Sequence, residues 1–258
     1  MKLFDSHCHL DDEKFYEDRE EVINQIFKSD VTKLISAGYS LESSKKALEL
    51  TKRYPQIYTV CGISPNDIKE NVENIEKEIK QIEILSSNQK VLGIGEIGLD
   101  YYWNKENKDL QQHAFIKQIE LANKRNLPIV IHTREAISDT IEILKNTIVK
   151  KTGVFHCCPL NKELVKEALK LGFYISFAGP ITFKNSKNAE EIIKLVPDDK
   201  ILIETDSPYL TPEPNRGKRN DPRNVKYIAQ KIAQVKEYSE DKVAELTYNN
   251  ACKVFEIK

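Results

Sequence analysis

Two histidines near the start of the chain have the residue type and spacing of metal ligands. The sequence opens MKLFDSHCHLDD, and His7 and His9 are two of only five histidines in 258 residues. They end and follow a short run that is typical of a β-strand, and residues two apart on a strand point to the same side. We therefore expect both imidazoles to face one site. Imidazole together with carboxylate suits zinc, manganese or iron-type divalent ions.

Four further candidates end or follow other β-rich runs. They are two histidines and two acids: His132, His156, Glu96 and Asp206. Six candidate ligands are more than one tetrahedral ion can bind, whereas two ions that share a carboxylate can bind all six. Glu96 is the expected bridge. Taken singly, His156 is more often a packed core histidine and Glu96 an ion-paired acid, so the hypothesis depends on their joint placement.

The elements that must position these residues alternate along the chain. Between the β-rich runs lie charged segments with apolar residues at helical spacing. The expected strands are 2–7, 33–38, 58–63, 91–98, 128–133, 153–158, 173–179 and 201–206. Strand–helix alternation predicts an α/β fold with a parallel sheet, and eight units predict a (β/α)8 TIM barrel, one domain over residues 1–258. An open doubly wound sheet is the alternative, but no G-x-G-x-x-G motif opens a helix.

Barrels of this type carry their chemistry at the C-terminal ends of the strands. All six candidates fall at those ends, so we expect them to converge at one face of the barrel. Asp5 and Glu204 each precede a candidate ligand by two residues and are expected one layer deeper. Glu204 is then placed to support the ligands from below.

Charge, hydropathy and cysteine content limit the ligands and the cellular location that we expect for this chain. The formal net charge of -1 argues against strong, indiscriminate nucleic-acid binding, although it leaves room for a local phosphate site. No apolar run is long enough to span a membrane, and Asp5 and His7 interrupt any signal-peptide core. Five cysteines, an odd number, show no zinc-ribbon spacing. We expect a cytoplasmic protein with free thiols and infer no obligate protein partner.

Basic and aromatic residues near the expected site are candidates for substrate contacts. Arg216 and Arg219 belong to the loop after the eighth strand, a place where barrels often bind phosphate, and Arg134 directly follows the His132 strand. A solvated basic turn is the alternative. The segment YYWNK, residues 101–105, offers rings on which nucleobases can stack, although such clusters are more often packing.

Several stretches resemble the TatD family of metal-dependent deoxyribonucleases, and the resemblance covers essentially the whole chain. They are DSHCHLD (5–11), GEIGLDYYW (95–103), IHTREA (131–136), FHC (155–157), ETDSPYL (204–210), RGKRNDP (216–222) and NNACKVF (249–255). The resemblance implies hydrolysis of DNA phosphodiesters with two divalent ions, such as zinc, manganese or magnesium. In the family pattern His7, His9, Glu96 and Asp206 hold one ion, while Glu96, His132 and His156 hold the other.

Two places depart from that pattern. Ser64 stands where the family usually has a histidine, a departure that bears on a substrate-contact or proton-transfer role at that position. Cys158, Pro159 and Leu160 replace a more flexible segment, so we expect a different shape of the substrate cleft near that loop. An amide or ester hydrolase on the same barrel, for example one acting on aminoacylated nucleic acid, remains the alternative activity. A non-catalytic metal-binding protein is a third hypothesis, which the complete ligand set argues against.

Two carboxylates are expected to be catalytic. Glu96 serves as the bridge between the ions. Asp206 is expected both to bind an ion and to take the proton of the attacking water.

Overall fold

The computed structural model describes residues 1–68 and 71–257, and within them eight strands form a single sheet in the order β1 to β8. Each strand pairs in parallel with the next. The strands are β1 (Leu3–Cys8), β2 (Val31–Ala37), β3 (Ile57–Cys61), β4 (Val91–Asp100), β5 (Ile129–Arg134), β6 (Val154–Phe155), β7 (Tyr174–Phe177) and β8 (Ile201–Ile203).

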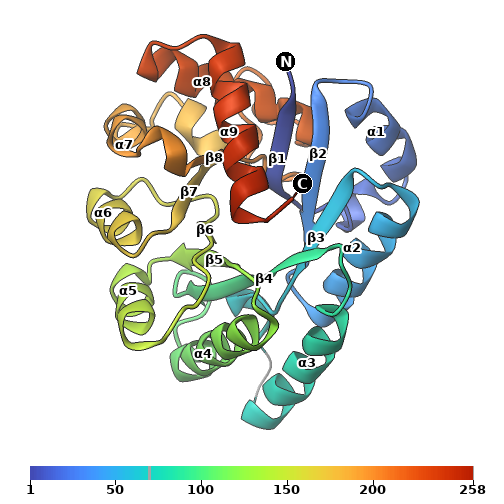
Figure 1. Ribbon diagram of the computed structural model, residues 1–258, viewed down its shortest axis with the longest axis vertical. Coiled ribbons are helices and arrows are strands. Elements are labelled where there is room, and N and C mark those ends of the chain that lie inside the picture. The colour runs from blue at the N-terminus through green and yellow to red at the C-terminus, as the bar shows by residue number, and fades with distance from the viewer. Residues whose placement is uncertain (69–70, 258) are drawn as a thin grey trace.

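Helices surround this sheet (Figure 1). They are α1 (Arg19–Ile26), α2 (Leu41–Arg53), α3 (Val72–Leu85), α4 (Lys108–Arg125), α5 (Ile137–Asn146), α6 (Lys162–Lys170), α7 (Ala189–Leu195), α8 (Val225–Lys236) and α9 (Glu240–Val254). The predicted single-domain (β/α)8 barrel is confirmed. The predicted range 1–258 also includes Lys69, Glu70 and Lys258, which lie outside the described residues. None of the described helices is both long and apolar enough to cross a membrane.

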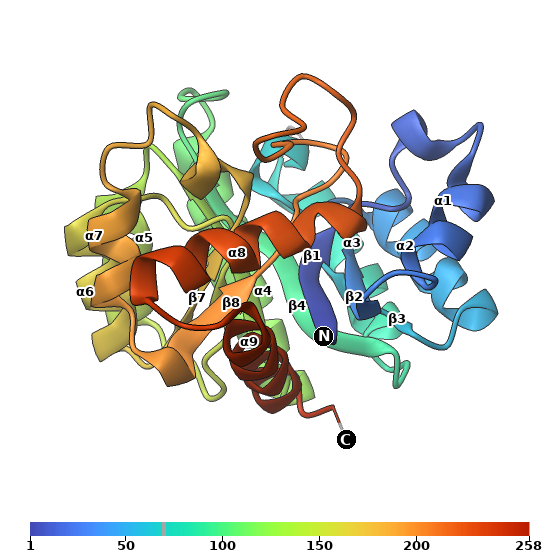
Figure 2. The ribbon, with the colours of Figure 1, turned by 90° about the horizontal axis from the view of Figure 1, so that it is seen from above.

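Most strand residues are buried, as expected of a parallel sheet that is covered on both faces. One hydrophobic cluster joins the strands to the surrounding helices. A second joins residues of the strands, among them Phe4, Val130 and Leu202, to Val254 and Phe255 at the end of α9. Figure 2 shows α9 and both chain ends on one side of the barrel and the β8–α8 loop on the other. The side away from α9 is therefore the side on which the strand-end loops gather.

Hydrogen bonds between distant segments close the barrel where β8 meets β1. The backbone N–H of His9 donates to the carbonyl of Ser207 at 2.7 Å, and that of Asp206 donates to the carbonyl of His7 at 2.9 Å. These bonds place the end of β1 directly beside the segment that follows β8. The seam thus brings together two of the sequence regions that carry predicted ligands.

Asp5 strengthens the seam from inside. It is fully buried, and its carboxylate accepts hydrogen bonds from the backbone N–H of Thr205 at 2.9 Å and from the Thr205 hydroxyl at 2.6 Å. Burial raises the pKa of Asp5 well above its usual range, against the effect of these donors. Because Thr205 precedes Asp206, Asp5 fixes the segment that carries Asp206 against β1.

Candidate metal centre

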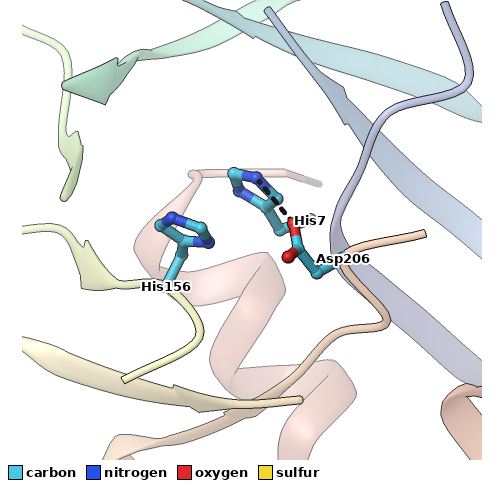
Figure 3. A group of neighbouring side chains, drawn as sticks. All are labelled: His7, His156 and Asp206. Carbon is cyan, nitrogen blue, oxygen red and sulfur yellow. Dashed lines mark ion pairs between the residues drawn. The ribbon is translucent and has the colours of Figure 1, made fainter. Parts of the chain in front are cut away.

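The structure brings the six predicted ligands together at the mouth of the barrel. Their ligand atoms form three groups in the described chain, each with all atoms within 4.8 Å of one another: His7, His9 and Glu96; His7, His156 and Asp206; and Glu96, His132 and His156. Figure 3 shows the side chains of His7, His156 and Asp206 pointing toward one another. We call the six residues the ligand cluster.

Three ligands sit differently on their strands than the sequence predicts. β4 continues to Asp100, so Glu96 lies inside the strand, within a register irregularity between Ile94 and Ile97. β6 ends just before His156, and β8 ends before Asp206. Asp206 adopts a left-handed backbone conformation, with φ of 55°, which aspartate tolerates better than most residues. These three ligands therefore lie on irregular backbone, Glu96 inside β4 and His156 and Asp206 beyond the ends of β6 and β8.

Glu96 presents a different oxygen to each of two histidine pairs. Its Oε1 lies 3.1 Å from Nδ1 of His132 and 3.5 Å from Nε2 of His156. Its Oε2 lies 3.5 Å from Nε2 of His7 and 3.8 Å from Nε2 of His9. Burial opposes ionisation of Glu96, but His156 and the other facing histidines hold its pKa well below the usual range. One ionised carboxylate thus faces both halves of the ligand cluster.

His9 and Asp206 form the second close contact of the cluster. Nε2 of His9 lies 3.3 Å from Oδ1 of Asp206, while its Nδ1 lies 2.9 Å from the carbonyl of Ala37. That carbonyl accepts a hydrogen bond from the Nδ1–H group and so turns Nε2 toward the cluster. Burial opposes charge on both side chains, yet Asp206 raises the pKa of His9 to about 9 and His9 lowers that of Asp206.

Access to the ligand cluster is uneven. The side chains of His132 and Asp206 are 19% and 15% exposed, whereas that of His7 is 1% exposed. Every member of the ligand cluster except His7 lines a cavity of about 910 Å³ that opens at the barrel mouth. Of these members, His132 and Asp206 are the most exposed.

A carboxylate that the sequence reasoning missed orients His132. Oδ2 of Asp100 lies 2.9 Å from Nε2 of His132, which leaves Nδ1 directed at Glu96. Oδ1 of Asp100 accepts hydrogen bonds from the backbone N–H groups of Tyr102 and Trp103, at 3.0 and 3.2 Å. An aspartate followed by turn residues is a recognisable turn signal, and it marks where β4 ends. Its pairing with His132 depends on the register between β4 and β5.

Glu204 supports His156 in the same way, at the depth the sequence predicts. It is fully buried, and its Oε1 lies 3.3 Å from Nδ1 of His156. The same oxygen accepts the backbone N–H of Cys157 at 2.7 Å. Outer carboxylates of this kind fix the orientation of ligating histidines and raise their basicity.

The donor set fits divalent metal ions. Imidazole nitrogens and carboxylate oxygens converge without a thiolate among them, which is the chemistry of zinc and manganese sites. Nε2 of His7 and Nε2 of His9 also approach each other to 3.3 Å, an arrangement that suits two nitrogens directed at one ion. The chemistry and convergence of these side chains support metal binding at the ligand cluster.

The predicted substrate contacts divide into two groups. Arg134 lines the cavity together with Ser64 and Pro159, two of the four positions that depart from the family pattern. In the described part of the chain, neither Arg216 nor Arg219 lines it. Arg216 is exposed with its guanidinium over the ring of Phe183, and Arg219 is paired with Asp18 at 2.6 Å. Contact of Arg216 and Arg219 with substrate phosphate stays a prediction.

Comparisons with known proteins place the chain among metal-dependent hydrolases. Residues 4–256 match the family model described as TatD related DNase. The uncharacterized metal-dependent hydrolase YabD of Bacillus subtilis is 42% identical over 256 residues, covering 99% of each chain. YcfH of Escherichia coli K12, also described as an uncharacterized metal-dependent hydrolase, is 35% identical over 261 residues, covering all of this chain and 97% of YcfH.

A solved structure agrees in fold. The TatD homologue YjjV from Escherichia coli superposes with a TM-score of 0.92 at 24% identity, over 99% of this chain and 98% of that one.

Proposed function

The chain belongs to the TatD family of metal-dependent hydrolases, and we propose that it cleaves phosphodiester bonds in DNA with two divalent ions. The observation that carries the proposal is the placement of Glu96, whose two oxygens each face a separate histidine pair. A carboxylate between two sets of nitrogen ligands suits a bridged pair of ions. The description of the matching family as a DNase supports the choice of bond.

His7, His9 and Asp206 would hold one ion, His132 and His156 would hold the other, and Glu96 would serve both, which is the division that the resemblance implies. Bound divalent ions polarise phosphoryl oxygens and lower the pKa of water. Asp100 and Glu204 keep the imidazoles of the second ion in position.

Asp206 is the proton acceptor in this proposal. Its side chain reaches the cavity, and its lowered pKa keeps the carboxylate ionised at neutral pH. It takes the proton of the attacking water and passes it toward the leaving oxygen. Arg134, which lines the same cavity, has a planar guanidinium that can bind the phosphate through paired hydrogen bonds.

Metal add-back on the purified chain tests this function. The chain is stripped with a chelator and resupplied with manganese, zinc or magnesium, then assayed against single-stranded DNA, duplex DNA, RNA and a panel of carboxylic esters and amides. We expect metal-dependent cleavage of DNA that Asp206→Asn slows by about 100-fold or more. Turnover of an ester or amide with no cleavage of DNA would contradict the phosphodiesterase proposal while leaving the hydrolase assignment in place.

A further inference from the structure

An exposed aromatic surface adjoins the ligand cluster. Trp103 is 68% exposed and Tyr102 is 47% exposed, and their rings meet edge to face with centroids 4.9 Å apart. The guanidinium of Arg134 lies 3.7 Å from the centroid of Tyr102 and 5.6 Å from that of Trp103. We call these three side chains the stacking platform.

The backbone beneath the platform is held in place. Asp100 accepts the N–H groups of both Tyr102 and Trp103. The neighbouring Tyr101 is buried, and its hydroxyl donates to Asp139 at 2.7 Å. Exposing an aromatic pair on a fixed turn forgoes the burial that normally stabilises such rings, which points to a ligand for their open faces.

The platform belongs to the same cavity as the ligand cluster. Trp103 and Arg134 line that cavity together with Glu96 and His132. The backbone N–H of Tyr101 donates to the carbonyl of Arg134 at 2.9 Å, so both parts of the platform project from the joined ends of β4 and β5. His132 lies on β5 as well. A molecule that reaches the ions therefore passes beside the platform.

The geometry points to a subsite for an unpaired nucleotide of single-stranded nucleic acid next to the bond being cleaved, an inference that rests on the proposed function. Aromatic faces stack with any base, and a guanidinium complements the phosphate that accompanies it. The faces of bases inside a duplex are already covered by their neighbours. The platform therefore selects single strands or frayed ends and tolerates any base sequence.

A double-mutant cycle between protein ring and nucleobase tests this subsite. The substrates are single-stranded 12-mers of DNA, intact or with one abasic residue moved stepwise along the chain, cleaved by the metal-loaded protein. In wild type we expect one or two abasic positions to lower kcat/KM by about 10-fold. Trp103→Ala should lower kcat/KM on the intact 12-mer by a similar factor and lose the abasic effect, because the two changes remove the same contact.

Two variants control for ring chemistry and for general surface effects. Trp103→Phe keeps an aromatic face and should retain most of the activity. Ile148→Ala removes an exposed apolar side chain, 77% exposed, from the segment between α5 and β6, and should behave as wild type.

Trp103 is also the only tryptophan in the sequence, so its fluorescence reports binding directly. A phosphorothioate 12-mer, chosen to resist cleavage, should quench it more strongly than an abasic analogue.

The two readouts separate failure of the subsite from failure of the proposed function. DNA cleavage with additive effects of Trp103→Ala and base removal would overturn the subsite and leave the function intact, giving the exposed rings another role such as a protein contact. Base-dependent quenching without any DNA cleavage would support the subsite and refute the phosphodiesterase function. If the chain shows no DNA cleavage and no quenching, both the subsite and the proposed function are overturned.

Discussion

Replacing Glu96 with alanine should lower metal occupancy at both ion positions of the ligand cluster. Glu96 presents Oε1 to His132 and His156 and Oε2 to His7 and His9, so the change removes one ligand from each ion. Loss of an outer-shell partner already weakens metal binding by about 10- to 100-fold. Loss of a direct carboxylate ligand should therefore cost at least about 100-fold at each position, or about 2.8 kcal/mol.

His132→Ala should act on one ion only. At a free metal concentration about ten times the wild-type Kd, a 100-fold loss lowers the occupancy of a site from about nine-tenths to about one-tenth. The number of bound ions per chain should thus fall from nearly two in wild type to well under one in the Glu96→Ala variant. The His132→Ala variant should still bind about one ion per chain.

Equilibrium dialysis against manganese or zinc, followed by elemental analysis, measures these values. His113→Ala, a histidine change within α4 and outside the ligand cluster, is the matched control. Circular dichroism confirms that each variant is folded. Equal metal losses from Glu96→Ala and His132→Ala would refute the bridging role of Glu96.

Three further predictions follow from neighbouring contacts. Asp206→Asn should lower kcat by about 100-fold or more while the ion at His132 stays bound, and a near-normal kcat with both ions present would limit Asp206 to ligation. Asp100→Asn should weaken metal binding at the His132 position by about 10- to 100-fold in dialysis and spare the other ion; equal weakening of both ions would contradict an orienting role. Asp5→Ala leaves the buried backbone N–H of Thr205 unpaired and removes one of the two acceptors of the Thr205 hydroxyl, the other being Oγ of Ser207 at 3.0 Å, so it should lower the free energy of unfolding by about 2–4 kcal/mol in urea titrations. Thr205→Val, which removes the hydroxyl, should cost about half as much, and a near-zero loss in Asp5→Ala would show that the seam does not depend on this contact.

The fold could be predicted because its strands are short apolar runs with helical periodicity between them. β2, β3, β5 and β7 appear within a few residues of their predicted positions, since parallel strands buried on both faces need continuous apolar sequence. β6 and β8 are shorter than predicted. The regular register ends at Phe155 and Ile203, although the backbone N–H groups of His156, Cys158 and Glu204 still donate to carbonyls of neighbouring strands. The side chains of His156, Glu204 and Asp206 turn to the ligand cluster.

The ligand cluster could be predicted because residue types at strand ends are visible in the sequence, whereas its supporting contacts depend on register. Asp100 was missed since β4 runs past Glu96, and its partner His132 lies on the neighbouring strand. The contact between Asp5 and Thr205 joins residues 200 positions apart in the sequence, which only closure of the barrel brings together. Similarly, the pairing of Arg219 with Asp18 follows from how two loops meet in space.

Anomalous diffraction from crystals of the wild-type chain grown with manganese tests the metal centre most directly. We expect two anomalous peaks at the barrel mouth about 3.5–4 Å apart, with one oxygen of Glu96 directed at each. His7, His9 and Asp206 should surround one peak, and His132 and His156 the other. A single peak, or peaks that Glu96 does not join, would contradict the bridged two-ion centre on which the proposed hydrolysis depends.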